Sequence, residues 1–159
     1  MDVAHLLAVV VHTIAFVIAW GYYGILGRIV LPALERSLDG QALGHAVAEI
    51  ERRALPLVGL SGVLFTISGS YLLAASPRYA GLGNLFASGW TTLLLAKHVV
   101  VVAFVVLAAA VDLQARRIGR GADDAAQRRE LARLSLATEV TTGLGAIVVI
   151  LTAVAQGTQ

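Results

Sequence analysis

Five ionisable side chains stand inside otherwise apolar stretches of this 159-residue sequence, and they decide which chemistry the protein can perform. They are His12, Arg28, Lys97, His98 and Glu139. Ionisable groups at membrane depth are costly, so they normally face a protein interior or a ligand. Imidazoles can ligate iron, a lysine can pair with an acidic group, and an arginine can pair with a glutamate. We therefore expect these residues to form a cofactor-binding site.

The two histidines are expected at matching depths. His12 follows His5 by seven residues, which places it roughly 10 Å below the outer edge at about 1.5 Å per helical residue. His98 follows Trp90 by eight residues and would lie roughly 12 Å down from the same side. Two such imidazoles could be the metal ligands of one haem iron; alternatively, each makes a hydrogen bond within the membrane. Because Lys97 and His98 point about 100° apart, only one of them is expected to face the centre.

The remaining three residues suggest charge pairing. Lys97 lies in the middle of an apolar stretch, where a haem propionate or an acidic substrate would be a natural partner. The alternative is snorkelling, although the nearest interface is roughly 10 Å away. Arg28 and Glu139 are expected at the same depth near the cytosolic side, as a buried ion pair that either aligns two helices or takes part in chemistry. Asp112 could join them.

The composition identifies the class of protein to which these residues belong. Hydrophobic residues make up 58% of the chain and charged residues only 14%, against about 25% in a soluble domain. The sequence has no cysteine, which excludes disulfides, thiolate metal sites and iron–sulfur clusters. Its single methionine is Met1, so soft ligands for Cu(I) are absent from the interior. No positive segment precedes the first apolar stretch, which predicts an uncleaved first span.

Four apolar stretches are long enough to cross a bilayer, which needs ~20 residues. They cover residues 3–31, 55–75, 90–113 and 134–155, and the first should end before Pro32. None alternates in polarity as strand spans would, so an all-α, antiparallel four-helix bundle forming a single domain is expected. Residues 42–53 have helical periodicity and should extend the second span into the cytosol, with Glu49, Glu51, Arg52 and Arg53 mainly away from the apolar face.

The arginines predict the orientation of this bundle. The second connection holds only Arg78, whereas the first and third connections with their flanks hold ten arginines: Arg28, Arg36, Arg52, Arg53, Arg116, Arg117, Arg120, Arg128, Arg129 and Arg133. Positive residues stay in the cytoplasm, so both termini and the second connection should face outward from the cell (inner) membrane. The basic clusters are expected to contact anionic lipid. A nucleic-acid partner is excluded, because it would need a larger soluble basic surface.

Small residues predict how the helices pack, because close approach replaces the hydrophobic drive inside lipid. They occur at helical spacing in three of the spans: Gly21, Gly24 and Gly27; Gly59, Gly62, Thr66 and Gly69; and Thr142, Gly143, Ala146, Ile150 and Ala153. We expect these stripes to lie at helix contacts, and Gly21, Gly24 and Gly69 to leave room for a flat macrocycle.

Several short motifs occur in a recognisable order along the chain. The first span reads HTIAFVIAWGYYGILGRIVLPALE, with His12, Trp20, Arg28 and Pro32 in sequence. Further motifs are Arg52-Arg53 with Gly69 downstream, LLLAK ending at Lys97, and TEVTT containing Glu139. The set resembles a four-helix superfamily that includes the HemJ-type protoporphyrinogen oxidases and the CopD copper-resistance membrane domain. The resemblance extends over almost the whole chain.

The resemblance implies a haem b held by His12, with Lys97, Arg28 and Glu139 as further functional positions. It also implies a tetrapyrrole substrate and an oxidoreductase of the protoporphyrinogen oxidase type. His98 is not part of the family pattern. In HemJ-type proteins a histidine tends to precede the Ala-Lys pair, where this chain has Leu95, and Thr138 and Thr141 depart from the family's Asn and Pro. These departures put that particular enzyme activity in question.

Three functions remain open at this point. The first is a b-type haem-binding membrane protein with a redox role, either electron transfer or porphyrinogen oxidation. The second is a CopD-like copper transport protein, for which imidazoles would have to replace sulfur ligands. The third is an accessory structural subunit, since a small bundle with glycine-rich faces suits a homo-oligomer or a larger membrane complex.

Overall fold

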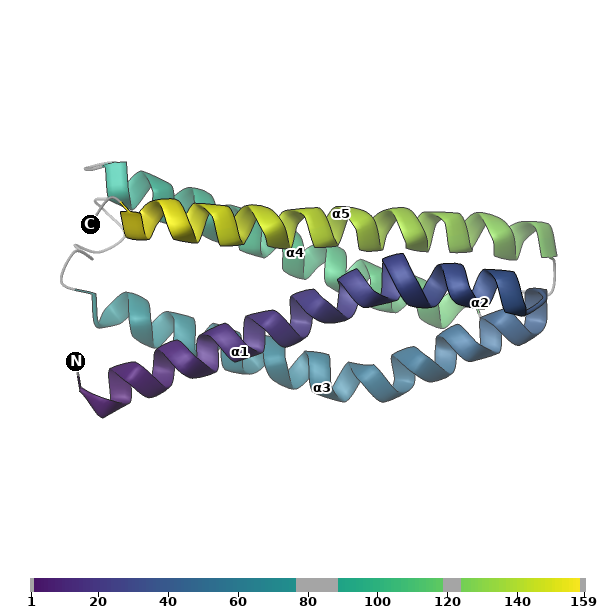
Figure 1. Cartoon of the computed structure of the whole chain (residues 1–159), viewed down its shortest axis with the longest axis horizontal. Coiled ribbons are helices and arrows are strands. Elements are labelled where there is room, and N and C mark those ends of the chain that lie inside the picture. The colour runs from purple at the N-terminus through teal and green to yellow at the C-terminus, as the bar shows by residue number, and fades with distance from the viewer. Residues whose placement is uncertain (1, 77–88, 119–123, 158–159) are drawn as a thin grey trace.

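The computed structural model describes residues 2–76, 89–118 and 124–157, and these residues are helical with short links (Figure 1). Arg78 and Arg120, which belong to the charge count above, lie outside them. The elements are α1 (Val3–Ile25), the π-helical turn η1 (Leu26–Val30), α2 (Leu31–Ser37), α3 (Gly40–Ala74), α4 (Gly89–Ile118) and α5 (Asp124–Gly157). No strand occurs in the described part of the chain, which confirms the all-α class.

Four of the described helical segments are long and apolar enough to cross a membrane: Val3–Ser37, Gly40–Ala74, Thr91–Ala115 and Arg128–Val154. Large apolar side chains point away from the protein along all of them, such as Ile14, Ile67, Val102 and Ile150. A surface of this kind suits lipid rather than water. The structure is thus consistent with a multi-pass membrane protein, as predicted.

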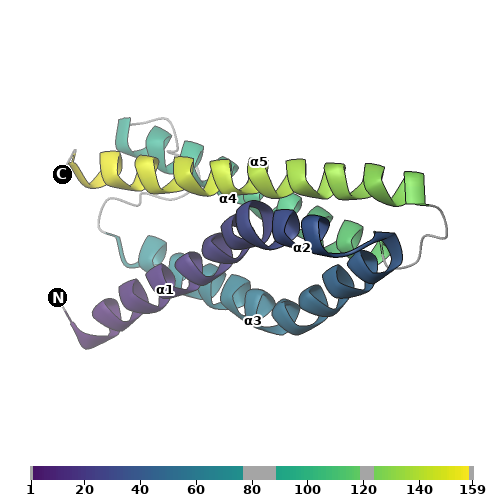
Figure 2. The ribbon, with the colours of Figure 1, turned by 45° about the vertical axis from the view of Figure 1, so that its right-hand side comes forward.

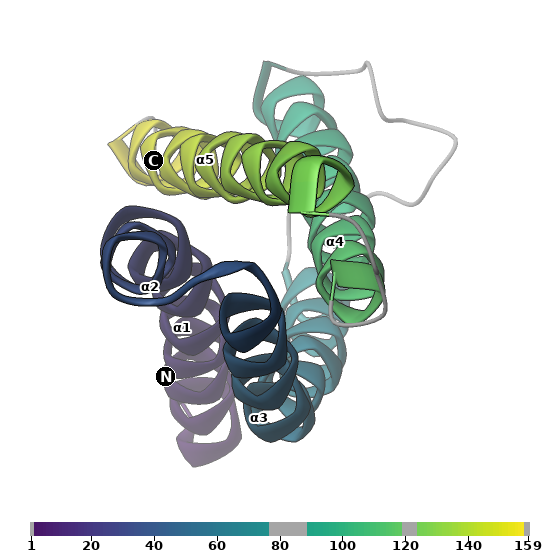
Figure 3. The same cartoon turned by 90° about the vertical axis from the view of Figure 1, so that its right-hand side faces the viewer.

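The helices form two hairpin-like pairs. α1 runs beside α3 and α4 runs beside α5, and the start of α1 lies at the same end of the molecule as the end of α5 (Figures 1 and 3). Toward that end, α1 and α3 diverge from α4 and α5 (Figure 2). The core gathers toward the opposite end, where Tyr23, Leu26, Val47, Val111 and Leu134 are almost fully buried.

The first helix is longer than predicted, because it does not stop before Pro32. Proline lacks the N–H that would bond to a carbonyl one turn earlier. The chain absorbs this defect by widening to a π turn, in which the N–H of Leu31 donates to the carbonyl of Leu26, and then continues helically to Ser37. π turns inside helices are frequent at functional sites, and this one contains Arg28.

The second helix confirms the predicted extension. α3 is continuous from Gly40 through Pro56 to Ala74, so residues 42–53 and the apolar span form one rod. Leu43, Val47 and Glu51 recur every four residues on its buried face. The placement of Glu51 away from the apolar face is therefore wrong.

The glycine stripes are only partly packing sites. A Cβ on Gly24 would contact the Thr142 side chain at 3.6 Å, and a Cβ on Gly27 would collide with Thr138, so α1 and η1 approach α5 closely there. The expected contacts are absent at other stripe positions. No described atom beyond the local backbone lies within 4 Å of a Cβ added at Gly21, Gly59, Gly62 or Gly143, and Thr66 and Ile150 are exposed. Gly145, not singled out from the sequence, packs against Trp20.

Candidate functional site

His12 is held by α3 through its Nδ1 atom. This nitrogen lies 3.0 Å from the Phe65 carbonyl oxygen and 3.1 Å from Ser68 Oγ. The imidazole stacks on the Phe65 ring with 4.1 Å between centroids. An added Cβ on Gly69 would lie only 2.8 Å from His12 Cε1, so the ring rests directly on the α3 backbone. Of the glycines expected to leave room for a macrocycle, Gly69 is therefore covered by His12.

These bonds fix the tautomer of His12. A carbonyl oxygen can only accept, so Nδ1 must carry the hydrogen. Ser68 donates its own hydroxyl hydrogen to the Leu64 carbonyl at 2.6 Å, which leaves its oxygen free to accept from His12 as well. Nε2 then keeps its lone pair, and no described residue donates to it. Histidines that ligate metals usually donate their other ring N–H in this way.

His98 has the same arrangement on α4. Its Nδ1 lies 2.7 Å from the Leu94 carbonyl one turn earlier, which again leaves the Nε2 lone pair available. The side chain is exposed, whereas neighbouring Lys97 is half-buried. The prediction that only one of the two would face inward is thus confirmed, and Lys97 is the inward one.

Lys97 and His98 both lie within electrostatic range of the His12 imidazole. Lys97 makes no hydrogen bond or ion pair with any described residue. The structure therefore places His12 of α1, and Lys97 and His98 of α4, in the same half of the bundle, toward its diverging end, with His12 packed on α3 and His98 exposed.

Arg28 and Glu139 also meet as predicted, at 3.5 Å between Arg28 Nε and Glu139 Oε1. The expectation that this pair is buried is wrong, because the two side chains are 63% and 46% exposed. The pair joins η1 to α5 on the outside of the bundle. It lies apart from His12, since Arg28 is 16 positions further along the same helical rod, roughly 24 Å at about 1.5 Å per residue.

A second polar group, not predicted from the sequence, lies in the core toward the same end as Arg28. Tyr22 donates to Glu51 Oε1 at 2.7 Å, and Tyr23 donates to Asp112 Oδ1 at 3.4 Å. Glu51 is 3% exposed and Tyr23 is 1% exposed. These four side chains link α1, α3 and α4. The sequence feature that could have revealed this polar group is the position of Glu51, four residues after Val47 and thus on the same buried face of the helix.

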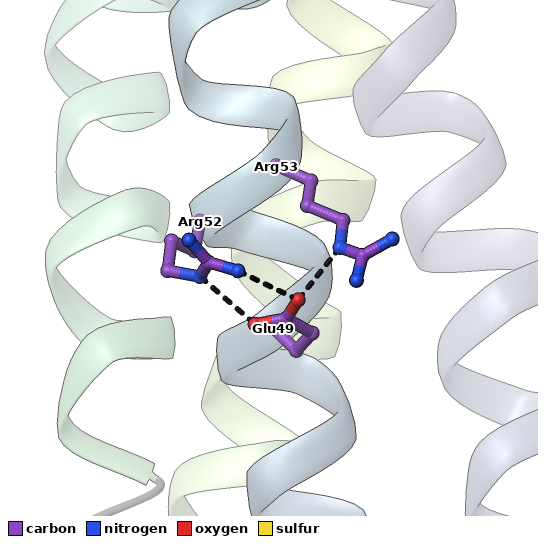
Figure 4. A network of polar contacts seen from close by, with 3 residues as sticks. All are labelled: Glu49, Arg52 and Arg53. Carbon is purple, nitrogen blue, oxygen red and sulfur yellow. Dashed lines mark hydrogen bonds and ion pairs between the residues drawn. The ribbon is translucent and has the colours of Figure 1, made fainter.

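Arg52 and Arg53, which belong to the family-like motifs, lie on the exposed side of α3 (Figure 4). Both bond to Glu49 one turn earlier: Arg52 through Nε and Nη2, each at 2.9 Å, and Arg53 through Nε at 2.6 Å. Exposed pairs of this kind add little stability. Their charge is available to lipid headgroups or solvent and does not reach the histidines.

The cavities limit what can bind inside the bundle. An apolar cavity of about 40 Å³ lies between α1, α3 and α4, lined by residues that include Phe16, Gly62 and Val101. This holds a molecule about the size of water. An open groove of about 310 Å³ lies between α1 and α3 and is lined by Leu7, Ser68 and other residues. No cluster of three or more His, Asp or Glu side chains suited to a metal ion occurs among the described residues.

No family model, curated protein or solved structure matches this chain. The resemblance to the HemJ and CopD superfamily therefore rests on the motifs alone.

Proposed function

We propose that this protein binds a b-type haem in a cell membrane and has a redox role. The observation that carries the proposal is the state of the two histidines. His12 and His98 each donate Nδ1–H to a backbone carbonyl, at 3.0 and 2.7 Å, and each keeps an Nε2 lone pair. Two imidazoles in this state would be suitable ligands for a haem iron.

The surrounding side chains fit the same group. Lys97 places an ammonium near His12 without an ion pair in the described part of the chain, and a haem propionate would neutralise it. Phe65 stacks on the His12 ring and holds its orientation. The 40 Å³ cavity is far too small for a macrocycle, so the group would bind outside that cavity. A bound haem would supply a one-electron couple whose potential depends on ligation and burial.

The residues of the chain have separate roles in this proposal. His12 and His98 bind the iron, while Phe65 O and Ser68 orient the first imidazole. Lys97 binds an acidic group of the cofactor or of an acidic substrate. Arg28 and Glu139 lie at the other end, so we assign them to joining η1 with α5 rather than to ligation. The family resemblance suggests porphyrinogen oxidation as the reaction. The distribution of arginines suggests that both termini face outward.

The absorption spectrum of the purified full chain tests the proposal. We expect a Soret band and a pyridine haemochrome typical of haem b, both strongly reduced by His12→Ala and by His98→Ala. His45→Ala is the matched control, because His45 is exposed on α3 and distant in sequence from both sites. Wild-type protein that takes up no haem, even after reconstitution, would overturn the proposal, and full haem content in both variants would overturn the ligand assignment.

A further inference from the structure

Most of the aromatic residues of the described chain form one connected series of rings. The His12 imidazole stacks on Phe65 at 4.1 Å between centroids, and Phe65 is 5.7 Å from Phe16. Three of the 4 phenylalanines in the sequence belong to the series: Phe104 is buried, and Phe16 and Phe65 are half-buried.

The series continues to the two core tyrosines. Phe16 is 6.2 Å from Phe104, Phe104 is 5.9 Å from Tyr23, and Tyr23 is 5.1 Å from Tyr22. All these separations fall in the range of direct aromatic contact, about 4.5–7 Å, or just below it. Electron tunnelling decays steeply with each gap, and rings in direct contact leave no gap between neighbouring side chains along this route.

The series crosses about half of the membrane thickness. Along α1 at about 1.5 Å per residue, His12 lies roughly 14 Å and Tyr22 roughly 29 Å from Val3. The hydrocarbon core is about 30 Å thick. The rings therefore connect the level of the histidines with the opposite edge of the apolar layer.

The far end of the series carries a proton acceptor. The Tyr22 hydroxyl donates to the Glu51 carboxylate at 2.7 Å; Glu51 is buried and Tyr22 is partly buried. A phenol that loses an electron becomes a strong acid, so a carboxylate in direct contact makes the oxidation feasible without a buried positive charge. Trp20 branches from Phe16 at 5.8 Å, but its Nε1–H donates to the Thr142 carbonyl, which cannot take up a proton in the same way.

We propose that Tyr22 is a redox-active tyrosine that delivers single electrons to the His12 end of the bundle through this ring series. The oxidant is a high-potential metal complex or tetrapyrrole at that end. Tyr22 loses one electron to it, the phenolic O–H bond breaks, and the proton passes to Glu51 Oε1. The oxidant is reduced by one electron, and a neutral tyrosyl radical and a protonated Glu51 remain. A one-electron donor reduces the radical, and Glu51 returns the proton.

The proposal goes beyond the redox function above, because the oxidant of Tyr22 must be far more oxidising than a haem iron held by two histidines. Its test needs no haem. The sequence has no cysteine, so a single cysteine introduced at exposed Thr13, next to His12, is the one thiol to which a label can attach. The full-length Thr13→Cys protein carries a thiol-reactive ruthenium polypyridyl, which a laser flash and a sacrificial electron acceptor convert to ruthenium(III). Electron paramagnetic resonance then detects any tyrosyl radical.

We expect a tyrosyl signal that is lost in Tyr22→Phe and retained in Tyr23→Phe, because a phenylalanine at position 23 keeps the ring contact. Tyr71→Phe is the matched control, since Tyr71 is exposed and outside the series. Phe104→Leu removes one ring at similar volume and should lower the signal. Phe16→Leu tests the same route at a position that is only half-buried. Glu51→Gln keeps the shape of the acceptor but not its basicity and should suppress radical formation.

Each remaining outcome would overturn the proposal. These outcomes are no tyrosyl radical in the parent, a radical that survives Tyr22→Phe, yields unchanged by Phe104→Leu and Phe16→Leu in helical protein, or no effect of Glu51→Gln. If the protein binds no haem but still forms the Tyr22 radical through the ring series, only the proposed cofactor is rejected. A haem-containing protein without the Tyr22 radical would reject the relay alone.

Discussion

Lys97 is the residue whose position is hardest to explain by structure alone. It lies in the apolar part of α4, makes no ion pair with a described residue, and faces inward near His12. A lysine at the centre of a transmembrane helix costs up to about 3 kcal/mol on insertion scales. We therefore expect Lys97→Met to stabilise the protein without ligand by up to this amount, measured by unfolding in mixed detergent, while weakening haem uptake in a titration.

The opposite signs of these two effects are what identify a binding role. Val102→Met on the same helix is the control, because Val102 is exposed and apolar and should change neither quantity. A Lys97→Met protein that is more stable and takes up haem as well as wild type would show that Lys97 does not contact the cofactor.

At the residue scale, the sequence singled out His12, Lys97 and His98, because ionisable groups stand out in apolar segments, and the structure places all three in the same half of the bundle. Their role as cofactor ligands stays a prediction. Glu51 was missed because it lies in the charged run Glu49 to Arg53, which looks solvated. Only its four-residue spacing from Val47 placed it on the buried face, where it meets Tyr22. The exposure of the Arg28–Glu139 pair was also beyond sequence reasoning, since matching depth says nothing about which side of a helix faces lipid.

At the scale of elements, the crossing of α1 and α3 depends on a single glycine. An added Cβ at Gly69 would lie 2.8 Å from His12 Cε1, and that ring cannot move without losing its bonds to Phe65 and Ser68. Overpacking costs typically about 1–3 kcal/mol. We expect Gly69→Ala to destabilise the bundle by about this amount in thermal unfolding, and to lower haem content in parallel with His12→Ala.

Gly59 on the same helix provides the matched control, because no described atom lies within 4 Å of an added Cβ there. Alanine in an open helical position gains about 0.5–1 kcal/mol over glycine, so Gly59→Ala should be neutral or stabilising. Equal effects of the two substitutions would mean that α1 and α3 do not meet at Gly69.

Hydropathy and length predicted the four long helices, because each apolar stretch exceeds the bilayer thickness. The same reasoning failed at Pro32 and at several glycines for a local reason. A proline does not end a helix where the backbone before it can adjust, and here the chain widens into the π turn in which the Leu31 N–H donates to the Leu26 carbonyl. Glycine spacing marks a face that can be approached closely, but it does not say whether this chain supplies the neighbour.

On the scale of the whole molecule, the bundle has one closed and one open end. Buried side chains gather where α2, the start of α3 and the start of α5 meet, and the helices diverge toward the two termini (Figures 1 and 2). His12 and His98 belong to the diverging half, which leaves His98 exposed. A cofactor or substrate could therefore enter there without unfolding the core, whereas the Tyr22–Glu51 contact at the closed half stays shielded.

The arginines predict which of these two ends faces the cytoplasm, and this orientation can be measured directly. Because positive residues remain in the cytoplasm, the closed end should face inward and the termini outward. We expect a membrane-impermeant maleimide to label Val3→Cys on intact cells, and to label Ser37→Cys only after the membrane is opened. Both positions are exposed, and the cysteine-free parent gives the background. Labelling of Ser37→Cys alone from outside would invert the topology and place the histidines toward the cytoplasm.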